Sequence, residues 1–221
     1  MVSIAIDGPS GAGKSSVAKE LSSRLGFIYL DTGALYRGIG YYFVNNGMDY
    51  NYEKKKKKNI NSIKIDVRFE NGTQNIYICN DNVTDKIRTE EISKAASKVS
   101  SMKSVRKFLL DLQKNMATKN NVIMDGRDIG TVVLPNADVK IFLTASPEER
   151  AKRRHEELIN KGNKISYEEV LKSINERDFN DSNRAIAPLK PADDAIVIDT
   201  TNYSFNQVVD KLMKIVEEKV R

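Results

Sequence analysis

Cysteine, histidine and long apolar runs are nearly absent from this 221-residue sequence, and each shortage narrows the possible functions. The single cysteine, Cys79, excludes an internal disulfide and fits a reducing cytosol; we expect it to be a small apolar residue of a strand. The single histidine, His155, excludes a metal site built from several histidines, so any metal is expected to have oxygen ligands. No run of 18 apolar residues occurs, which argues against a membrane-spanning helix.

Composition and net charge further limit the possible fold classes and binding partners. Hydrophobic residues make up 40% of the chain and charged residues 30%, a balance typical of one globular domain with a buried core. The formal net charge of +6 predicts an anionic partner, which can be nucleic acid or the phosphates of nucleotides. Because the chain begins directly with a predicted strand, we expect no signal peptide, a cytoplasmic location and no membrane partner.

The most informative stretch is Gly8–Ser15, which reads G-P-S-G-A-G-K-S and fits the phosphate-loop pattern G-x-x-x-x-G-K-[ST]. The short β-branched run Val2–Ile6 precedes it and predicts a buried strand. Apolar residues at helical spacing predict a helix over Lys14–Leu25, with Gly26 as its stop. Strand, glycine-rich loop and helix therefore follow one another in the order that such a loop requires.

This order determines the chemistry of the loop. Glycines allow backbone N–H groups to turn inward around a polyphosphate, and the helix N-terminus adds partial positive charge. We expect Lys14 to reach the β- and γ-phosphates and the Ser15 hydroxyl to ligate Mg²⁺. The alternative, a plain glycine-rich turn, explains neither residue. The sequence therefore predicts a nucleoside triphosphate site.

Five short apolar runs separated by helical segments predict a P-loop-type α/β fold, with a parallel sheet of about five strands covered by helices on both faces. The predicted strands are Val2–Ile6, Phe27–Leu30, Val122–Met124, Val139–Leu143 and Ala195–Ile198. A serine followed three residues later by glutamate or glutamine is typical of a helix start, and this signature occurs at Ser146, Ser166 and Ser204.

One region breaks this α/β rhythm. Hydrophobic and polar residues alternate between positions 63 and 83 around Asn71-Gly72, which predicts a small antiparallel hairpin unit inserted into the parallel fold. The run Lys54–Lys58 precedes it. We interpret this run as a solvated surface, with a nucleic-acid contact as the alternative.

Phosphate loops occur in GTPases, motor ATPases and small-molecule kinases, so other motifs are needed to distinguish these classes. The GTPase patterns D-x-x-G and N-K-x-D are absent. Arg153 and Arg154 lie three and four residues after Arg150 on one predicted helix face, where like charges repel one another. One interpretation is a solvated face balanced by Glu156 and Glu157; the other is a set of cationic contacts to a transferred phosphoryl group.

Polar clusters follow two of the predicted strands. Asp31–Arg37 comes after the second strand and Asp125–Asp128 after the third, at the edge where open α/β sheets bind ligands. A helix cap and a tight turn are the plain interpretations, but a turn leaves two carboxylates unexplained. A third cluster, Arg177–Arg184, resembles a frayed helix end when it is taken alone.

Together these stretches resemble the bacterial cytidylate kinase family. The phosphate loop, Leu30–Arg37, Asp125–Thr131 and Asp181–Pro188 occur in the family's order, and the inserted hairpin unit matches its enlarged monophosphate-binding region. The resemblance covers essentially the whole chain and has no departure at a motif position. Only the lysine run looks idiosyncratic.

The resemblance implies a role for each site residue. It implies that ATP is bound by Gly8, Pro9, Ser10, Gly11, Ala12, Gly13, Lys14, Ser15, Ser16 and Arg154. Ser10, Arg37 and Arg127 would hold the CMP phosphate. Cytosine would be read by Ser97, Arg106 and Asp128, and the ribose held by Arg177 and Asp181. Asp31 and Thr32 would belong to the substrate site, and Asp31 and Asp125 would support the geometry of phosphate and Mg²⁺. The implied catalytic residues are Lys14, Arg150, Arg153, Arg184 and Asp125.

The sequence thus predicts a nucleoside monophosphate kinase that transfers a phosphoryl group from MgATP to CMP or dCMP. We expect a single domain, with a core over 1–36, 120–148 and 185–221, an insert over about 37–119 and a lid over about 149–184. We expect a monomer that binds small-molecule substrates and no nucleic acid. The alternatives are a kinase for another small acceptor, such as a different nucleotide or shikimate, and a nucleic-acid-binding ATPase or regulatory phosphate-loop protein.

Overall fold

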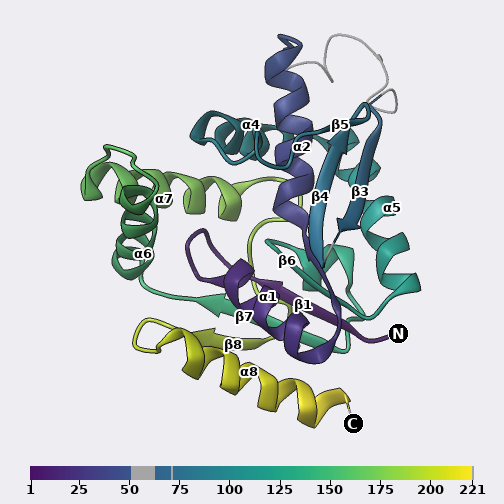
Figure 1. Ribbon diagram of the computed structural model, residues 1–221. Helices are drawn as coiled ribbons and strands as arrows, with labels where there is room; N and C mark the ends of the chain where they lie inside the picture. The colour runs from purple at the N-terminus through teal and green to yellow at the C-terminus, as the bar shows by residue number, and fades with distance from the viewer. Residues whose placement is uncertain (51–62, 71, 221) are drawn as a thin grey trace.

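The computed structural model describes residues 1–50, 63–70 and 72–220. Its main sheet has five parallel strands in the order β2-β6-β1-β7-β8 (Figure 1). These strands are β1 (Ser3–Asp7), β2 (Ile28–Asp31), β6 (Val122–Gly126), β7 (Val139–Thr144) and β8 (Ile196–Asp199). Every predicted core strand matches an observed one to within two residues at each end, so the predicted parallel α/β fold is confirmed.

Helices cover both faces of this sheet. The described helices of the whole molecule are α1 (Lys14–Leu25), α2 (Thr32–Asn45), α4 (Glu90–Ser100), α5 (Lys103–Lys119), α6 (Pro147–Asn160), α7 (Tyr167–Asn183), α8 (Phe205–Val220) and a short π-helical turn over Ile129–Val133. On one face α1 and α8 pack against β1, β7 and β8, whereas α5 and the π-helical turn pack against the other. None of the described helices is both long and apolar enough to cross a membrane.

The inserted unit is a separate antiparallel sheet. It consists of β3 (Ile65–Glu70), β4 (Thr73–Ile78) and the short β5 (Asp81–Asn82). Glu70 pairs with Thr73, which confirms the predicted hairpin between β3 and β4. Gly72 takes the left-handed φ of +74° that such a turn requires, whereas its predicted partner Asn71 lies outside the described residues, as does Lys54–Lys58.

The interpretation of Cys79 as a small apolar residue of a strand is wrong. This residue follows β4, has a φ of +50° and is exposed. Its backbone N–H still donates to the carbonyl oxygen of Lys64, but the chain turns immediately afterwards toward β5. The side chain therefore lies in a turn, outside the alternating pattern that buries Ile76 and Ile78.

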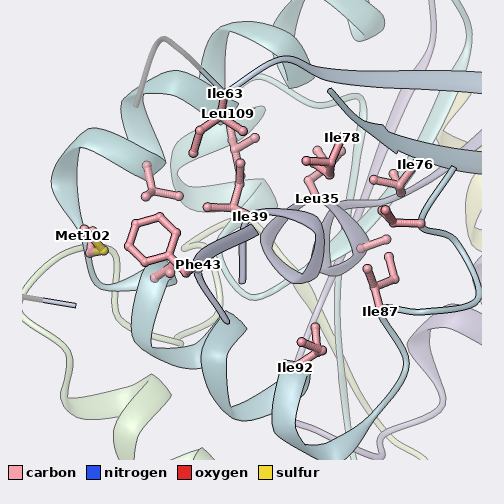
Figure 2. Close-up of a cluster of buried hydrophobic side chains, with 14 residues drawn as sticks. Leu35, Ile39, Phe43, Ile63, Ile76, Ile78, Ile87, Ile92, Met102 and Leu109 are labelled. Carbon is pink, nitrogen blue, oxygen red and sulfur yellow. The ribbon is translucent and has the colours of Figure 1, made fainter. Parts of the chain in front are cut away.

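The inserted unit has its own apolar core, which is organised around α2 (Figure 2). Leu35, Ile39 and Phe43 follow one another at four-residue spacing along α2 and are completely buried. Figure 2 shows Ile76 and Ile78 of β4 close to Leu35. Because α2 begins directly at the end of β2, this packing also determines the direction in which the chain leaves the main sheet.

Helices α6 and α7 form a further packed unit. They contact each other through Ala151, Val170 and Ile174, a cluster distinct from those of the main sheet and the insert. Figure 1 shows the two helices projecting from one side of the molecule. The side chain of Ser166 caps α7, and Glu169 returns the hydrogen bond, which confirms the predicted capping box.

The buried core of the insert predicts a clear difference between two phenylalanines. Replacing Phe43 by alanine removes a ring that is completely buried and should lower the free energy of unfolding by about 3–5 kcal/mol. Phe179→Ala, at a position that is 68% exposed, should change it by less than about 0.5 kcal/mol. Chemical denaturation of both variants measures this difference. Equal losses would contradict the assignment of α2 to the centre of the core.

Candidate active site

A cavity of about 730 Å³ lies at the carboxyl edge of the main sheet. Most of the site residues predicted from the sequence line it: Ser10, Gly11, Ala12, Gly13, Lys14, Ser15, Ser16, Asp31, Thr32, Arg37, Ser97, Asp125, Arg127, Asp128, Arg153, Arg154, Arg177, Asp181 and Arg184. The predicted site residues that do not line it are Gly8, Pro9, Arg106 and Arg150. The structure therefore brings together segments that are far apart in the sequence.

The phosphate loop connects β1 to α1 and depends on glycine at two positions. Gly8 has a φ of +147°, and a Cβ atom there would lie 1.9 Å from the carbonyl oxygen of Leu143. Gly13 has a φ of +87° and precedes α1 without a side-chain cap. The first amide groups of α1 therefore lack a side-chain acceptor at the cap position, and they lie where a bound anion can accept their hydrogen bonds.

Lys14 is only 6% exposed, and its ammonium group donates to the carbonyl oxygen of Pro9 at 2.6 Å. Burial and the nearby charge of Arg127 lower the pKa of Lys14 to about 7, although Asp125 and Asp7 oppose the shift. A negatively charged phosphate at this position would stabilise the ammonium form. Lys14 is therefore expected to carry its full positive charge when a phosphate is bound in the loop.

Asp125, at the end of β6, is 4% exposed and held by hydroxyl groups on both carboxylate oxygens. Ser15 donates to Oδ2 and Tyr29 donates to Oδ1, each at 2.8 Å. Burial and the neighbouring Asp31 raise the pKa of Asp125, whereas Lys14, Ser15 and Tyr29 lower it. Tyr29 was not among the residues predicted from the sequence.

The oxygen atoms of Ser15 and Asp125 fit the predicted Mg²⁺, which prefers hard oxygen ligands and usually takes only one or two from the protein. Within residues 1–50, 63–70 and 72–220, no group of three or more histidine, cysteine, aspartate or glutamate side chains could hold a metal. The donor set therefore fits an ion that arrives with phosphate oxygens and completes its coordination with them.

Asp31 joins the main sheet to the insert. Its carboxylate accepts from the backbone N–H of Ala34 at 2.8 Å, which caps α2, and pairs with Arg37 at 2.6 Å. Arg88 lies 3.7 Å from the same carboxylate and also lines the cavity. Burial alone raises the pKa of Asp31, but the two arginines outweigh it and hold the pKa below its usual value. The Nε atom of Arg37 is buried without a hydrogen-bond partner.

Asp128 lies between two arginines from different parts of the chain. Arg106 of α5 and Arg184, directly after α7, both form ion pairs with its carboxylate, the latter at 3.0 Å. The Nε of Arg184 also donates to the carbonyl oxygen of Ala187 at 2.5 Å. Asp128 and Arg184 line the cavity together with Ser97, whereas Arg106 lies behind them. Of the three residues assigned to the base by resemblance, Ser97 and Asp128 therefore line the cavity, and Arg106 is joined to it through its ion pair with Asp128.

A third pair leaves one arginine without a carboxylate. Arg127 and Asp181 are 2.8 Å apart, and Arg127 outweighs the effect of burial to keep the pKa of Asp181 low. Arg177, one helical turn before Asp181, forms no hydrogen bond or ion pair with the part of the chain that the structure describes. Burial and the nearby Arg127 lower the pKa of Arg177. This cluster therefore has capacity for a further negative charge.

The prediction that the three α6 arginines repel one another is wrong, because each of them forms an ion pair with a different carboxylate. Arg150 is 4% exposed and pairs with Asp178 of α7 at 2.5 Å. Arg153 pairs with Glu149 at 3.0 Å, whereas Arg154 pairs with Glu157 at 2.7 Å. The alternative of a face balanced by glutamates is thus correct for Arg154. Helical spacing placed the arginines near one another but did not indicate the opposite charges that separate them.

Arg150 also connects this helix to the phosphate loop. Its guanidinium donates to the carbonyl oxygen of Ser10 and to that of Ala145, both at 2.9 Å. The backbone N–H of Ser10 lies 3.4 Å from Asp178. The ion pair between Arg150 and Asp178 therefore lies beneath the loop and outside the lining of the cavity.

Other lining residues were missed in the sequence, among them Arg88, Tyr203 and Phe205. Arg88 follows no predicted core strand, so no local signal identifies it. Tyr203 and Phe205 flank the predicted helix cap Ser204 and come just after β8. The end of a predicted strand followed by a predicted helix start is therefore the local signal that indicates this segment.

The lowered pKa of Lys14 predicts proton uptake when an anion binds. Near pH 8 the free side chain, with a pKa of about 7, is mostly neutral, and bound phosphates should raise its pKa and restore the charge. Binding of metal-free ADP at pH 8 should therefore add close to one proton, measured by calorimetry in buffers of different ionisation enthalpy. Lys14→Arg stays charged at every pH and should take up none. Binding by the unmodified protein without uptake would contradict this account of Lys14.

Solved structures with a similar fold have little sequence in common with this chain. An uncharacterised protein from Eubacterium ventriosum superposes with a TM-score of 0.54 at 13% identity, covering 98% of each chain. TT1252 from Thermus thermophilus superposes with a TM-score of 0.50 at 18% identity and covers 100% of this chain and 98% of its own. At these identities the likeness concerns the fold alone.

The sequence comparisons are more specific. The family model described as cytidylate kinase matches residues 4–218. A cytidylate kinase from Carboxydothermus hydrogenoformans is 48% identical over 216 residues, which cover 98% of this chain and 97% of that protein. One from Halalkalibacterium halodurans is 48% identical over 219 residues and 99% of each chain. The chain belongs to the cytidylate kinase family.

Proposed function

We propose that this protein transfers the γ-phosphoryl group of ATP to the phosphate of CMP or dCMP, producing ADP and CDP or dCDP. One observation carries this proposal: a single cavity joins the uncapped phosphate loop to a cluster of arginines that is not fully neutralised. Two polyanions can therefore bind with their phosphates facing each other. Family membership and the names of the relatives support cytidine as the nucleoside of the acceptor.

At the donor end, the loop from Gly8 to Ser16 would surround the polyphosphate of ATP. Backbone N–H groups of the loop and the ammonium of Lys14 would contact the β- and γ-phosphates. Mg²⁺ bound through Ser15, with Asp125 behind it, would neutralise charge that accumulates on the transferred group. Arg153 and Arg154, which also line the cavity, would add cationic contacts when the ligand is present.

At the acceptor end, Ser10, Arg37 and Arg127 would hold the phosphate of CMP. Arg37 contributes its unpartnered Nε, and Arg127 lies beside the unpaired Arg177. An oxygen of this phosphate attacks the γ-phosphorus while the bond to the leaving ADP breaks. Because that oxygen is already anionic, transfer requires no general base, and the main contribution of the protein is positioning and charge stabilisation.

Recognition of cytosine would use Asp128, Arg106 and Ser97. The 4-amino group of cytosine is a donor, and its ring N3 and O2 atoms are acceptors, so a carboxylate and a guanidinium complement this edge. Uracil has a carbonyl at position 4, which would face a carboxylate with no proton between the two oxygens. Leaving a buried polar group unpaired costs about 1–3 kcal/mol, and more when the group is charged.

The α6–α7 pair would act as a lid over the donor. This subdivision, with a lid over about 149–184 and an insert over about 37–119, is supported by the separate apolar clusters of the two units. Closure over ATP would exclude water and favour transfer to CMP over hydrolysis. Arg150 would not move freely in such a closure, because it is bound to the loop carbonyl of Ser10.

The proposal predicts which acceptor stimulates turnover. ADP release from MgATP should be slow alone and increase strongly with CMP or dCMP, but not with AMP, shikimate or single-stranded nucleic acid. A coupled assay for ADP with each compound in turn measures this. Stimulation by nucleic acid alone would favour the alternative of a nucleic-acid-binding ATPase, and stimulation by another small acceptor would retain the kinase and change its substrate.

The proposed contact to cytosine predicts the effect of one isosteric substitution. The unmodified protein should prefer CMP to UMP by on the order of a hundredfold or more in kcat/KM. Asp128→Asn places an amide where the acceptor oxygen was, and it should reduce this preference by roughly tenfold or more, chiefly by weakening the use of CMP. Asp66→Asn makes the same change in an exposed pair with Arg68 and should leave the preference unaltered. An unchanged ratio in Asp128→Asn would remove this residue from base recognition.

A further inference from the structure

Tyr29 reaches the candidate active site from β2, an edge strand of the main sheet. Alternate residues of a strand face opposite sides, and on β2 the side chains of Phe27 and Tyr29 pack against the cluster between the sheet and helices α1 and α8. Ile28 and Leu30 belong to the cluster on the other face. The tyrosine ring is therefore anchored by apolar packing, and its hydroxyl group extends toward the carboxyl edge of the sheet.

The neighbouring strand places Asp125 on this same face. Strands β2 and β6 are parallel, with Tyr29 opposite Ile123 and Asp31 opposite Asp125. Ile123 packs in the same cluster as Tyr29, and Asp125 follows two residues later, so its side chain lies on the same face. Asp125 is therefore the diagonal neighbour of Tyr29 on the adjacent strand. The tyrosine hydroxyl donates to its Oδ1 atom at 2.8 Å.

This hydrogen bond complements the one from the phosphate loop. Ser15 donates to Oδ2 of Asp125 at 2.8 Å, so each carboxylate oxygen has one hydroxyl donor. Ser15 belongs to the first turn of α1, whereas Tyr29 belongs to the sheet. Burial and the charge of Asp125 raise the pKa of Tyr29, which therefore remains a proton donor throughout the working range of pH.

We infer that Tyr29 is a positioning residue, whose hydroxyl fixes the orientation of the Asp125 carboxylate toward the metal that arrives with the nucleotide. The inference rests on the proposed function, because it requires Mg²⁺ bound with the nucleotide phosphates near Ser15. Tyr29 does not line the cavity, so it has no direct route to the ligand and acts only through Asp125.

Loss of the Tyr29 hydroxyl group should weaken only the Mg²⁺-dependent part of nucleotide binding. In Tyr29→Phe, the ring keeps its packing, but Oδ1 of Asp125 loses the hydroxyl donor and the carboxylate can rotate about the contact to Ser15. Residues that orient a metal-binding group through hydrogen bonds typically contribute ~10–100-fold to metal affinity. Contacts from the loop amides and Lys14 to the phosphates do not involve Tyr29, so binding without metal should be preserved.

Calorimetric titration with ADP, in the presence of Mg²⁺ and then of EDTA, tests the inference. The ratio of the two dissociation constants gives the Mg²⁺-dependent part of the affinity. We expect Tyr29→Phe to reduce this ratio about tenfold or more while the metal-free affinity stays unchanged. Tyr77→Phe is the matched control: it removes a hydroxyl group of β4 that donates to Glu70 of β3 at 3.2 Å, and it should alter neither constant.

The possible outcomes separate the inference from the proposed function. An unchanged ratio in Tyr29→Phe, with normal Mg²⁺ dependence in the unmodified protein, would overturn the positioning role and leave the kinase assignment intact. Equal weakening with and without Mg²⁺, accompanied by a lower melting temperature, would also overturn it and indicate a structural role. If the unmodified protein bound ADP without any effect of Mg²⁺, both the inference and the proposed donor site would fail.

Discussion

Partial compensation of buried positive charge is the constraint on which this site depends. Carboxylates at the strand ends, such as Asp31 and Asp128, neutralise arginines that come from the insert and from the segment after α7. Without these partners, the desolvated guanidinium groups would be costly to bury, because the loss of one member of a buried pair leaves an unbalanced charge. The compensation is incomplete at Arg177, which is consistent with a site that binds anions.

Ion pairs also connect the main sheet to the α6–α7 pair, whose apolar cluster is separate from that of the sheet. The main sheet, the insert and the α6–α7 pair each have an apolar cluster, and the cavity lies where they meet. Between the main sheet and the α6–α7 pair the contacts are polar: Arg127 binds Asp181, and Arg150 donates to the carbonyl oxygen of Ser10 in the phosphate loop. Polar contacts exchange with ligands and water more readily than a packed core does, so this seam is the place where movement between the units is least costly.

Much of the architecture was predictable because its signals are local. A five-residue apolar run, a glycine-rich turn and helical spacing are sufficient to place β1, the phosphate loop and α1, since each depends on neighbouring residues. Ser166 and Glu169 likewise satisfy each other across one helical turn. The same reasoning was wrong for Cys79, because it took no account of where the ladder ends and the chain turns. Periodicity locates an element more reliably than its last residue.

The sequence by itself determined the parallel α/β fold, the phosphate loop with Lys14 and Ser15, and the strand ends at which polar residues gather. Only the tertiary structure decided which charges meet: Arg150 with Asp178, Arg184 with Asp128, and the Tyr29 hydroxyl with Asp125. The physical reason is the range of the interactions. Backbone hydrogen bonds, caps and apolar periodicity act over a few residues, whereas these pairs join residues that are 28 to 96 positions apart and come into contact only after the sheet and helices have packed.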